Sequence, residues 1–145
     1  MKDFLLRFGM SGREGITYVV VPEAGSPEII AYYMVSPDPL MVVEIEPDEE
    51  VEVNWVWLRA MAVASRYQRQ GIGTRILGRL IRQTLDAANR HPSIEALALR
   101  ALDEEAKKWY LERDLGFRES YPPKSLTLDL PVATMRQLLR PISEI

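Results

Sequence analysis

An apolar strand, a glycine-containing turn and a long amphipathic helix follow one another between residues 53 and 89, which is the order of a βαβ unit. Residues 55–63 are rich in aromatic, branched and small apolar side chains, as a buried strand should be. From Ile72 to about residue 89, apolar residues recur at helical spacing, whereas arginines fall largely on the other side. With a second apolar strand expected at 94–101, this order predicts a right-handed parallel crossover and a ligand at the carboxyl end of the first strand.

The turn between strand and helix has the composition of an anion-binding loop. Gly71 and Gly73 allow a ligand to approach the backbone closely. The first amides of the helix lack partners within it and lie at the positive end of its dipole, so they favour a diphosphate and hence a nucleotide-type cofactor. No Lys-Ser or Lys-Thr follows Gly73 and position 76 is not glycine, which disfavours nucleotide triphosphatases and Rossmann dinucleotide sites. An ordinary strand-to-helix turn is the alternative interpretation.

The hexapeptide Gln68-x-x-Gly71-x-Gly73 resembles the Q/R-x-x-G-x-G/A signature of the GCN5-related N-acetyltransferase (GNAT) family. This resemblance implies an N-acetyltransferase that uses acetyl-CoA and binds its pantetheine arm along strand 60–63. It also implies that a helix at 103–113 carries Tyr110 near the thioester. The cofactor-binding residues that it implies are Met61, Ala62, Val63, Gln68, Arg69, Gln70, Gly71, Ile72, Gly73 and Thr74. Five residues separate Tyr110 from the Gly116-Phe117 turn that the family shares, two more than its commonest spacing.

Several segments resemble one subgroup of the family, the acetyltransferase toxins of bacterial toxin–antitoxin pairs. These segments are 17–21, 30–36, 59–63, 101–106 and 125–131. The resemblance implies acetylation of the α-amino group of aminoacyl-tRNA, a ribbon-helix-helix antitoxin as partner, and a homodimer. Only residues 1–5 resemble the end of the subgroup's amino-terminal segment. We therefore expect a single GNAT-like domain over residues 1–145 with a shortened amino terminus.

Acyl transfer to an amine needs a neutral amine, a stabilised oxyanion and a proton for the departing thiolate. Tyr110 is the expected proton donor, because a phenol with a reference pKa of about 10 is protonated at neutral pH. An aromatic residue that only packs in the core is the alternative. No carboxylate stands out as a general base, which fits an α-amino group better than a lysine, because their reference pKa values are about 7.7–8.0 and about 10.4. A water bridged to Glu44, Glu46 or Glu52 would instead serve a lysine or polyamine.

Three functions stay open at this point. The acceptor is either the α-amino group of aminoacyl-tRNA, which the toxin-like segments favour, or the amine of a small molecule or protein. The third possibility is a catalytically inactive CoA-binding module, which the short amino terminus and the spacing after Tyr110 would explain. His91, next to Pro92, is interpreted as a helix-terminus residue without a catalytic role.

Composition limits the remaining classes of protein. The 145 residues, with 47% hydrophobic and 27% charged side chains, suit one globular domain. The absence of cysteine and the single histidine exclude disulfides and argue against a metal site. Apolar stretches are only strand-length and no leader is evident, so we expect a cytoplasmic protein without a membrane span. Charge is unevenly distributed along the chain. Residues 1–58 hold 3 basic and 11 acidic side chains, whereas residues 59–145 hold 15 basic and 10 acidic ones. This distribution is compatible with a polyanion beside the cofactor or with solvated arginines.

The expected fold class is α/β (α+β): a mixed, mostly antiparallel GNAT-like sheet with one parallel crossover and flanking helices. The acidic run from Glu44 to Glu52 is interpreted as a solvated loop. The expected strands are 16–21, 28–36, 40–45, 53–63, 94–101, 117–121 and 126–130. The expected helices are 3–8, 72–89, 103–113, with Asp103 as N-cap, and a closing turn at 135–139.

Overall fold

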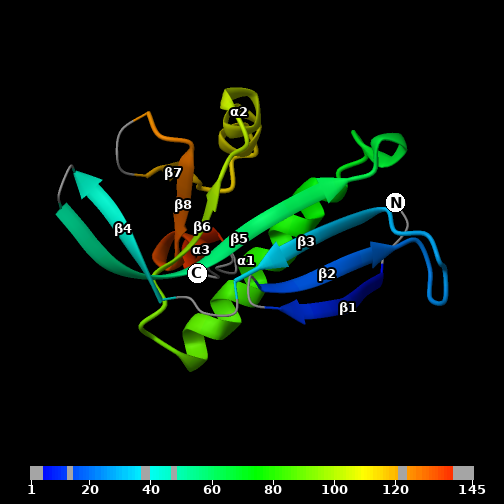
Figure 1. The fold of residues 1–145 in the computed structure, drawn as a ribbon, viewed down its shortest axis with the longest axis horizontal. Coiled ribbons are helices and arrows are strands. Elements are labelled where there is room, and N and C mark those ends of the chain that lie inside the picture. The colour runs from blue at the N-terminus through cyan, green and yellow to red at the C-terminus, as the bar shows by residue number, and fades with distance from the viewer. Residues whose placement is uncertain (1–4, 13–14, 37–39, 47–48, 121–123, 139–145) are drawn as a thin grey trace, which may run out of the picture.

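The computed structural model describes residues 5–12, 15–36, 40–46, 49–120 and 124–138. They form an eight-stranded sheet and three α-helices (Figure 1). The strands are β1 (Leu5–Gly12), β2 (Gly15–Val21), β3 (Ala31–Val35), β4 (Leu40–Glu46), β5 (Glu49–Val63), β6 (Ala96–Arg100), β7 (Arg118–Glu119) and β8 (Thr127–Pro131). The helices are the 3₁₀ turn η1 (Ser65–Tyr67), α1 (Ile72–Arg90), α2 (Glu104–Glu112) and α3 (Val132–Leu138).

The strand order is β1-β2-β3-β5-β6-β8-β7, with β4 paired to the first half of β5. Only β5 and β6 pair in parallel, through the registers from Trp55↔Ala96 to Leu58↔Leu99, and α1 connects them. All other neighbours are antiparallel. The predicted fold class, a mostly antiparallel sheet with one parallel crossover, is therefore confirmed.

The core lies between the sheet and the apolar stripe of α1, which runs alongside β5 (Figure 1). The buried residues of α1 are Ile72, Ile76, Leu77, Leu80, Ile81, Thr84 and Ala88. They repeat at helical spacing, and the apolar ones among them pack in one cluster with Leu97, Leu99, Leu128 and Leu130 of β6 and β8. This burial fixes α1 against the sheet, and with it the position of the glycine turn from which α1 starts.

Two expectations for the acidic half of the chain were wrong. The helix expected at 3–8 is strand β1 over its described residues, because Leu5–Phe8 pair with Tyr18–Val21 of β2. The acidic run expected to be a loop belongs, over its described residues, to β4 and β5, in which Val42 opposes Glu52 and Val43 opposes Val51; residues 47 and 48 lie outside the described residues. In both cases pairing with a neighbouring strand outweighs the local composition. Residues 3 and 4, and the ends of the expected elements at 121 and 139, lie outside the described residues.

Helix α2 is fixed to the sheet by a buried lysine. Lys107 is 7% exposed, and its Nζ lies 3.5 Å from Oε2 of Glu119 in β7. The other carboxylate oxygen of Glu119 accepts a hydrogen bond from the backbone N–H of Lys124. Glu119 therefore links α2, β7 and the start of the segment before β8.

This link predicts that replacing Glu119 destabilises the protein more than replacing Lys107. We expect Glu119→Gln to lower the free energy of unfolding by about 1–3 kcal/mol, because it leaves a buried ammonium without its counter-charge. Lys107→Met should cost less, because a methionine fills a similar volume and leaves only a partly exposed carboxylate. Urea denaturation measures both, with Lys108→Met, from the exposed Lys108–Glu112 pair, as the control. A larger loss in Lys107→Met than in Glu119→Gln would contradict the assignment.

Candidate cosubstrate site

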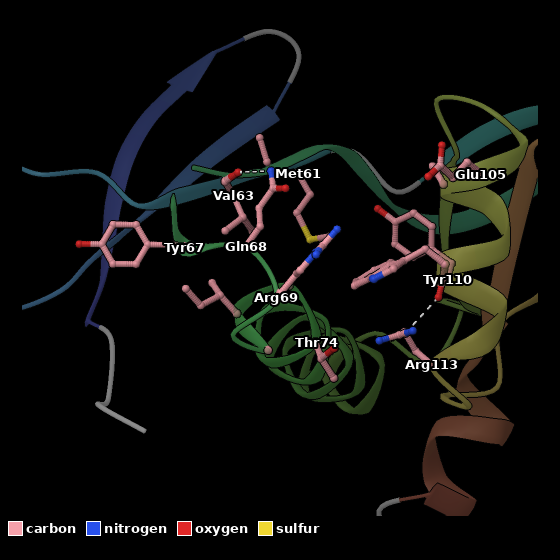
Figure 2. Close-up of a pocket in the computed structure, with 15 residues that line it drawn as sticks. Met61, Val63, Tyr67, Gln68, Arg69, Thr74, Glu105, Tyr110 and Arg113 are labelled. Carbon is pink, nitrogen blue, oxygen red and sulfur yellow. Dashed lines mark hydrogen bonds between the residues drawn. The ribbon is translucent and has the colours of Figure 1, made fainter. Parts of the chain in front are cut away.

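A cavity of about 820 Å³ opens where the end of β5, the start of α1 and the helix α2 meet (Figure 2). Its described lining residues are Met61, Ala62, Val63, Tyr67, Gln68, Arg69, Gly71, Ile72, Gly73, Thr74, Glu105, Ala106, Trp109, Tyr110 and Arg113. The cavity thus lies at the carboxyl end of the first strand of the parallel crossover, where the sequence placed a ligand.

Of the predicted site residues, all but one line this cavity. The exception is Gln70, which is exposed and whose side-chain amide lies 3.4 Å from the backbone oxygen of Arg66. The sequence did not identify Tyr67, the α2 residues Glu105, Ala106 and Trp109, or Arg113 at the C-cap of this helix. The last four lie with Tyr110 on one side of the helix, so the helical periodicity around Tyr110 was the signal that would have found them.

The two glycines of the turn are needed for different reasons. Gly71 is the N-cap of α1 and adopts φ 80° and ψ 10°, a left-handed conformation that glycine accepts at no steric cost. Gly73 makes room for an aromatic ring, because a Cβ at this position would lie 3.2 Å and 3.3 Å from Cη2 and Cζ2 of Trp109. Arg69, on the same turn, also has a positive φ, 64°, which is uncommon for a residue with a side chain. The backbone here is shaped to present the first amides of α1 to the cavity.

A bulge in β5 opens one edge of this strand to the cavity. Met34 pairs with Ala60 and Val35 with Leu58, so Arg59 is the extra residue. The N–H of Ala64 donates to the oxygen of Ile30 on the β3 side. Because backbone groups alternate along a strand, those of Met61 and Val63 point to the opposite edge. The pairs between β5 and β6 end at Leu58↔Leu99, so this edge has no strand beside it.

Side chains of the turn tie it to the rest of the domain. Nε2 of Gln68 donates a 3.0 Å hydrogen bond to the open-edge oxygen of Val63. The Tyr67 hydroxyl donates to Oε1 of Glu28, 3.0 Å away in the segment between β2 and β3, and the same carboxylate pairs with Arg66. The turn is therefore held from two sides before any ligand binds.

Tyr110 projects from α2 toward the β5 side of the cavity (Figure 2). Its ring packs edge-on against Trp109 and Phe117, with centroid separations of 5.0 Å and 6.0 Å. Burial raises the pKa of the Tyr110 phenol above its ordinary value, so the hydroxyl carries its proton through neutral pH. None of the hydrogen bonds between the described residues involves this hydroxyl. It is therefore a protonated donor without a partner in the described part of the chain.

The unusual spacing after Tyr110 does not displace this residue. α2 ends at Glu112, Arg113 is its C-cap, and Asp114 and Gly116 turn the chain with φ values of 56° and 97°. The extra residues are thus accommodated in the turn, outside the helix. The predicted N-cap is also present, because Oδ1 of Asp103 accepts the N–H of Ala106 at 2.8 Å.

The charges along the cavity are unevenly distributed. Arg69 and Arg113 are close to the positive end of α1, and Arg113 lies over the ring of Trp109 at 5.0 Å and donates from Nε to its backbone oxygen at 3.2 Å. Two cations beside a helix N-terminus favour an anion there. Glu105 is the single acidic residue among the described lining residues, and Figure 2 shows it at the opposite end of α2 from Arg113.

Other predictions concern regions away from this cavity. His91 is the C-cap of α1, as expected of a helix terminus, and lines a separate cavity of about 680 Å³. The side chains of Glu44, Glu46 and Glu52 lie outside the described residues. Among the residues that are described, no three His, Cys, Asp or Glu side chains form a group able to hold a metal ion. No helix in the described part of the chain is long and apolar enough to span a membrane.

The fold and the cavity define a protein that accommodates a phosphate-bearing ligand at a strand-to-helix turn. The model of the acetyltransferase (GNAT) family matches residues 3–117, so the chain belongs to the GNAT acetyltransferase family. This confirms the predicted class of enzyme, an N-acetyltransferase that uses acetyl-CoA. No curated protein matches the chain.

Solved structures with the same fold include those of bacterial toxins. A KacTA–DNA complex matches with a TM-score of 0.69 and 27% identity, over 88% of this chain and 74% of that one. A mutant of the toxin AtaT, bound to the C-terminus of the antitoxin AtaR and to acetyl-CoA, matches with a TM-score of 0.70 and 19% identity, over 88% and 74% of the two chains. AtaT complexed with acetyl-methionyl-tRNAfMet matches with a TM-score of 0.71 and 19% identity, over 86% and 75%. The predicted likeness to the toxin subgroup is confirmed.

Proposed function

We propose that this chain binds acetyl-CoA in the cavity between β5, α1 and α2 and transfers the acetyl group to a primary amine. The observation that carries the proposal is that one cavity joins an anion-binding helix end, an open strand edge and a protonated phenol. Each of these three features matches a chemical need of the reaction. We further propose that residues 1–145 act as one domain.

The residues of the cavity suit the two polar parts of acetyl-CoA. The backbone amides of residues 72–74 would hold the diphosphate, and Arg69 and Arg113 would face its negative charges. The open-edge backbone groups of Met61 and Val63 would pair with the amides of the pantetheine arm, as an added strand pairs with a sheet edge. The hydrogen bond from Gln68 to the oxygen of Val63 supports this pairing, because an amide donor on the cavity side already reaches that oxygen.

Tyr110 is the proposed proton donor. As the neutral amine nitrogen bonds to the acetyl carbon, the bond from that carbon to sulfur breaks and the sulfur takes the proton of the Tyr110 hydroxyl. The proton that the nitrogen releases returns to the tyrosinate through solvent. A backbone N–H near Val63 would polarise the thioester carbonyl. The burial that raises the pKa of Tyr110 keeps its proton in place for this step at neutral pH.

For the acceptor we favour an α-amino group, and among these the α-amino group of aminoacyl-tRNA. Two observations support this choice: the likeness to AtaT complexed with acetyl-methionyl-tRNAfMet, and the concentration of basic residues in the half of the chain that forms the cavity. Such an enzyme would pair with an antitoxin and form a homodimer, as expected from the toxin-like segments, and would act in the cytoplasm, as expected from composition. The alternatives are a small-molecule or protein amine and an inactive CoA-binding module.

One experiment tests the proposal and separates the alternatives. Purified protein is titrated with acetyl-CoA by calorimetry, and thiol release is then followed with bulk aminoacyl-tRNA and with a panel of small amines and peptides. We expect binding, with release on charged tRNA. Release only on a small amine or peptide would replace the acceptor, and binding without release would favour the inactive module. No binding of acetyl-CoA would contradict the central proposal.

A further inference from the structure

We propose that Glu105 receives the amino group of the acceptor and takes up its proton, and that its charge selects acceptors without a free α-carboxylate. This inference rests on the proposed acetyltransferase function and assigns the acceptor end of the same cavity. Glu105 lines the cavity, is exposed to it, and takes part in none of the ion pairs formed between the described residues. A carboxylate in this position is free to pair with an incoming ammonium group.

The geometry of α2 separates the two substrates by charge. Glu105 and Arg113 are eight residues apart, which is about 12 Å along a helix axis. Figure 2 shows them at opposite ends of α2, with Tyr110 between them. Arg113 is on the side of Thr74 and the start of α1, where the phosphates would lie. An ammonium group would be repelled from that end and attracted to Glu105.

Tyr110 is oriented toward the same end. Side chains on a helix lean toward its N-terminus, so the ring of Tyr110 leans from its own Cα toward the turn that carries Glu105. Figure 2 shows the hydroxyl at that end of the cavity. The reaction centre therefore lies between the phenol, which gives a proton to the sulfur, and the carboxylate, which accepts one from the amine.

The proton balance of this step is complete. Glu105 takes one proton from the ammonium group, directly or through a water, and leaves a neutral amine that attacks the acetyl carbon. When the carbon–nitrogen bond forms and the carbon–sulfur bond breaks, the nitrogen loses its second proton to solvent and the sulfur gains one from Tyr110. Transfer of a proton from Glu105 to the tyrosinate through solvent restores both groups. A free amino acid brings its own carboxylate next to the amine, and Glu105 would repel it, whereas an ester or amide brings none.

Glu104 provides a matched control for the test. Both glutamates lie in the first turn of α2 and both stabilise the helix dipole to a similar extent, but only Glu105 lines the cavity. Glu105→Gln and Glu104→Gln are compared with wild type in acetyl-CoA titration and in transfer to methionyl-tRNA, methioninamide and methionine. For Glu105→Gln we expect kcat/KM for the amide to fall by at least about tenfold, acetyl-CoA affinity to stay within about twofold, and the preference for amide over amino acid to shrink. Glu104→Gln should match wild type.

The pH dependence provides a second measurement, one that a purely structural role would not change. As pH rises through the pKa of an α-amino group, about 7.7–8.0, the amine loses its proton without help, so the deficit of Glu105→Gln should diminish. Equal behaviour of the two glutamine variants, or a deficit that is constant with pH, would overturn the inference while leaving the acetyltransferase intact. Failure of the wild type to bind or turn over acetyl-CoA would instead contradict the proposed function.

Discussion

Replacing Tyr110 with phenylalanine should slow acetyl transfer by about 100-fold or more while acetyl-CoA affinity stays within about twofold, the range typical of losing a general acid. The ring contacts with Trp109 and Phe117 do not need the hydroxyl, so the variant keeps its packing. Only the proton for the departing thiolate is lost. Single-turnover thiol release measures the transfer step, and calorimetry measures binding.

The pH dependence of the transfer rate tests the same role of Tyr110, because its direction follows from the raised pKa. Because burial raises the pKa of Tyr110, the protonated form persists at and somewhat above the ordinary value of about 10. Transfer that depends on this proton should be lost only as pH rises through the raised pKa, and Tyr110→Phe should lack this alkaline loss. Tyr32→Phe, on an exposed tyrosine outside the cavity, is the control. If Tyr110→Phe keeps full activity, the residue has only a packing role.

The parallel crossover was predictable because its signals are local. Each buried position of α1 from Ile72 to Ala88 belongs to a 3.6-residue pattern that can be recognised without knowing the partner. The turn before α1 was predictable for a similar reason. A glycine at position 71 indicates a backbone conformation that favours glycine, and Gly71 adopts such a conformation. The cavity formed by these elements was therefore expected in its correct place.

The errors share a different cause. β1, β4 and the first half of β5 are defined by pairing with a neighbouring strand, such as Leu5↔Val21 and Val43↔Val51, whereas glycines interrupt the first segment and acidic residues the second. The contribution of α2 was also underestimated, because the ring that a side chain at position 73 would crowd belongs to Trp109, which is 36 residues later. The sequence around Gly73 and the sequence around Trp109 give no sign of this contact. Predicting the site from sequence thus reached the turn, with Arg69, and Tyr110, but not the charged residues Glu105 and Arg113.

A bulky residue at Gly71 should abolish tight binding of acetyl-CoA. Gly71 has φ 80°, and a valine in this left-handed conformation is strained by at least about 1–2 kcal/mol. The strain can be relieved only by rearranging the turn, which moves the first amides of α1 away from the diphosphate. We expect Gly71→Val to raise the Kd of acetyl-CoA by at least about tenfold, which corresponds to about 1.4 kcal/mol of binding free energy.

Two other glycines of α1 show whether the loss is specific to the turn. A Cβ at Gly78 would meet nothing within 4 Å, so Gly78→Ala should stabilise the helix and leave the Kd unchanged. Gly73→Ala should give an intermediate loss, because its Cβ would displace the ring of Trp109 by a few tenths of an ångström. Calorimetric Kd values and urea unfolding are measured for all three variants, since binding must be separated from stability. Wild-type affinity in a folded Gly71→Val would mean that the start of α1 does not hold the diphosphate, and the phosphates would then have to lie on Arg69 and Arg113 alone.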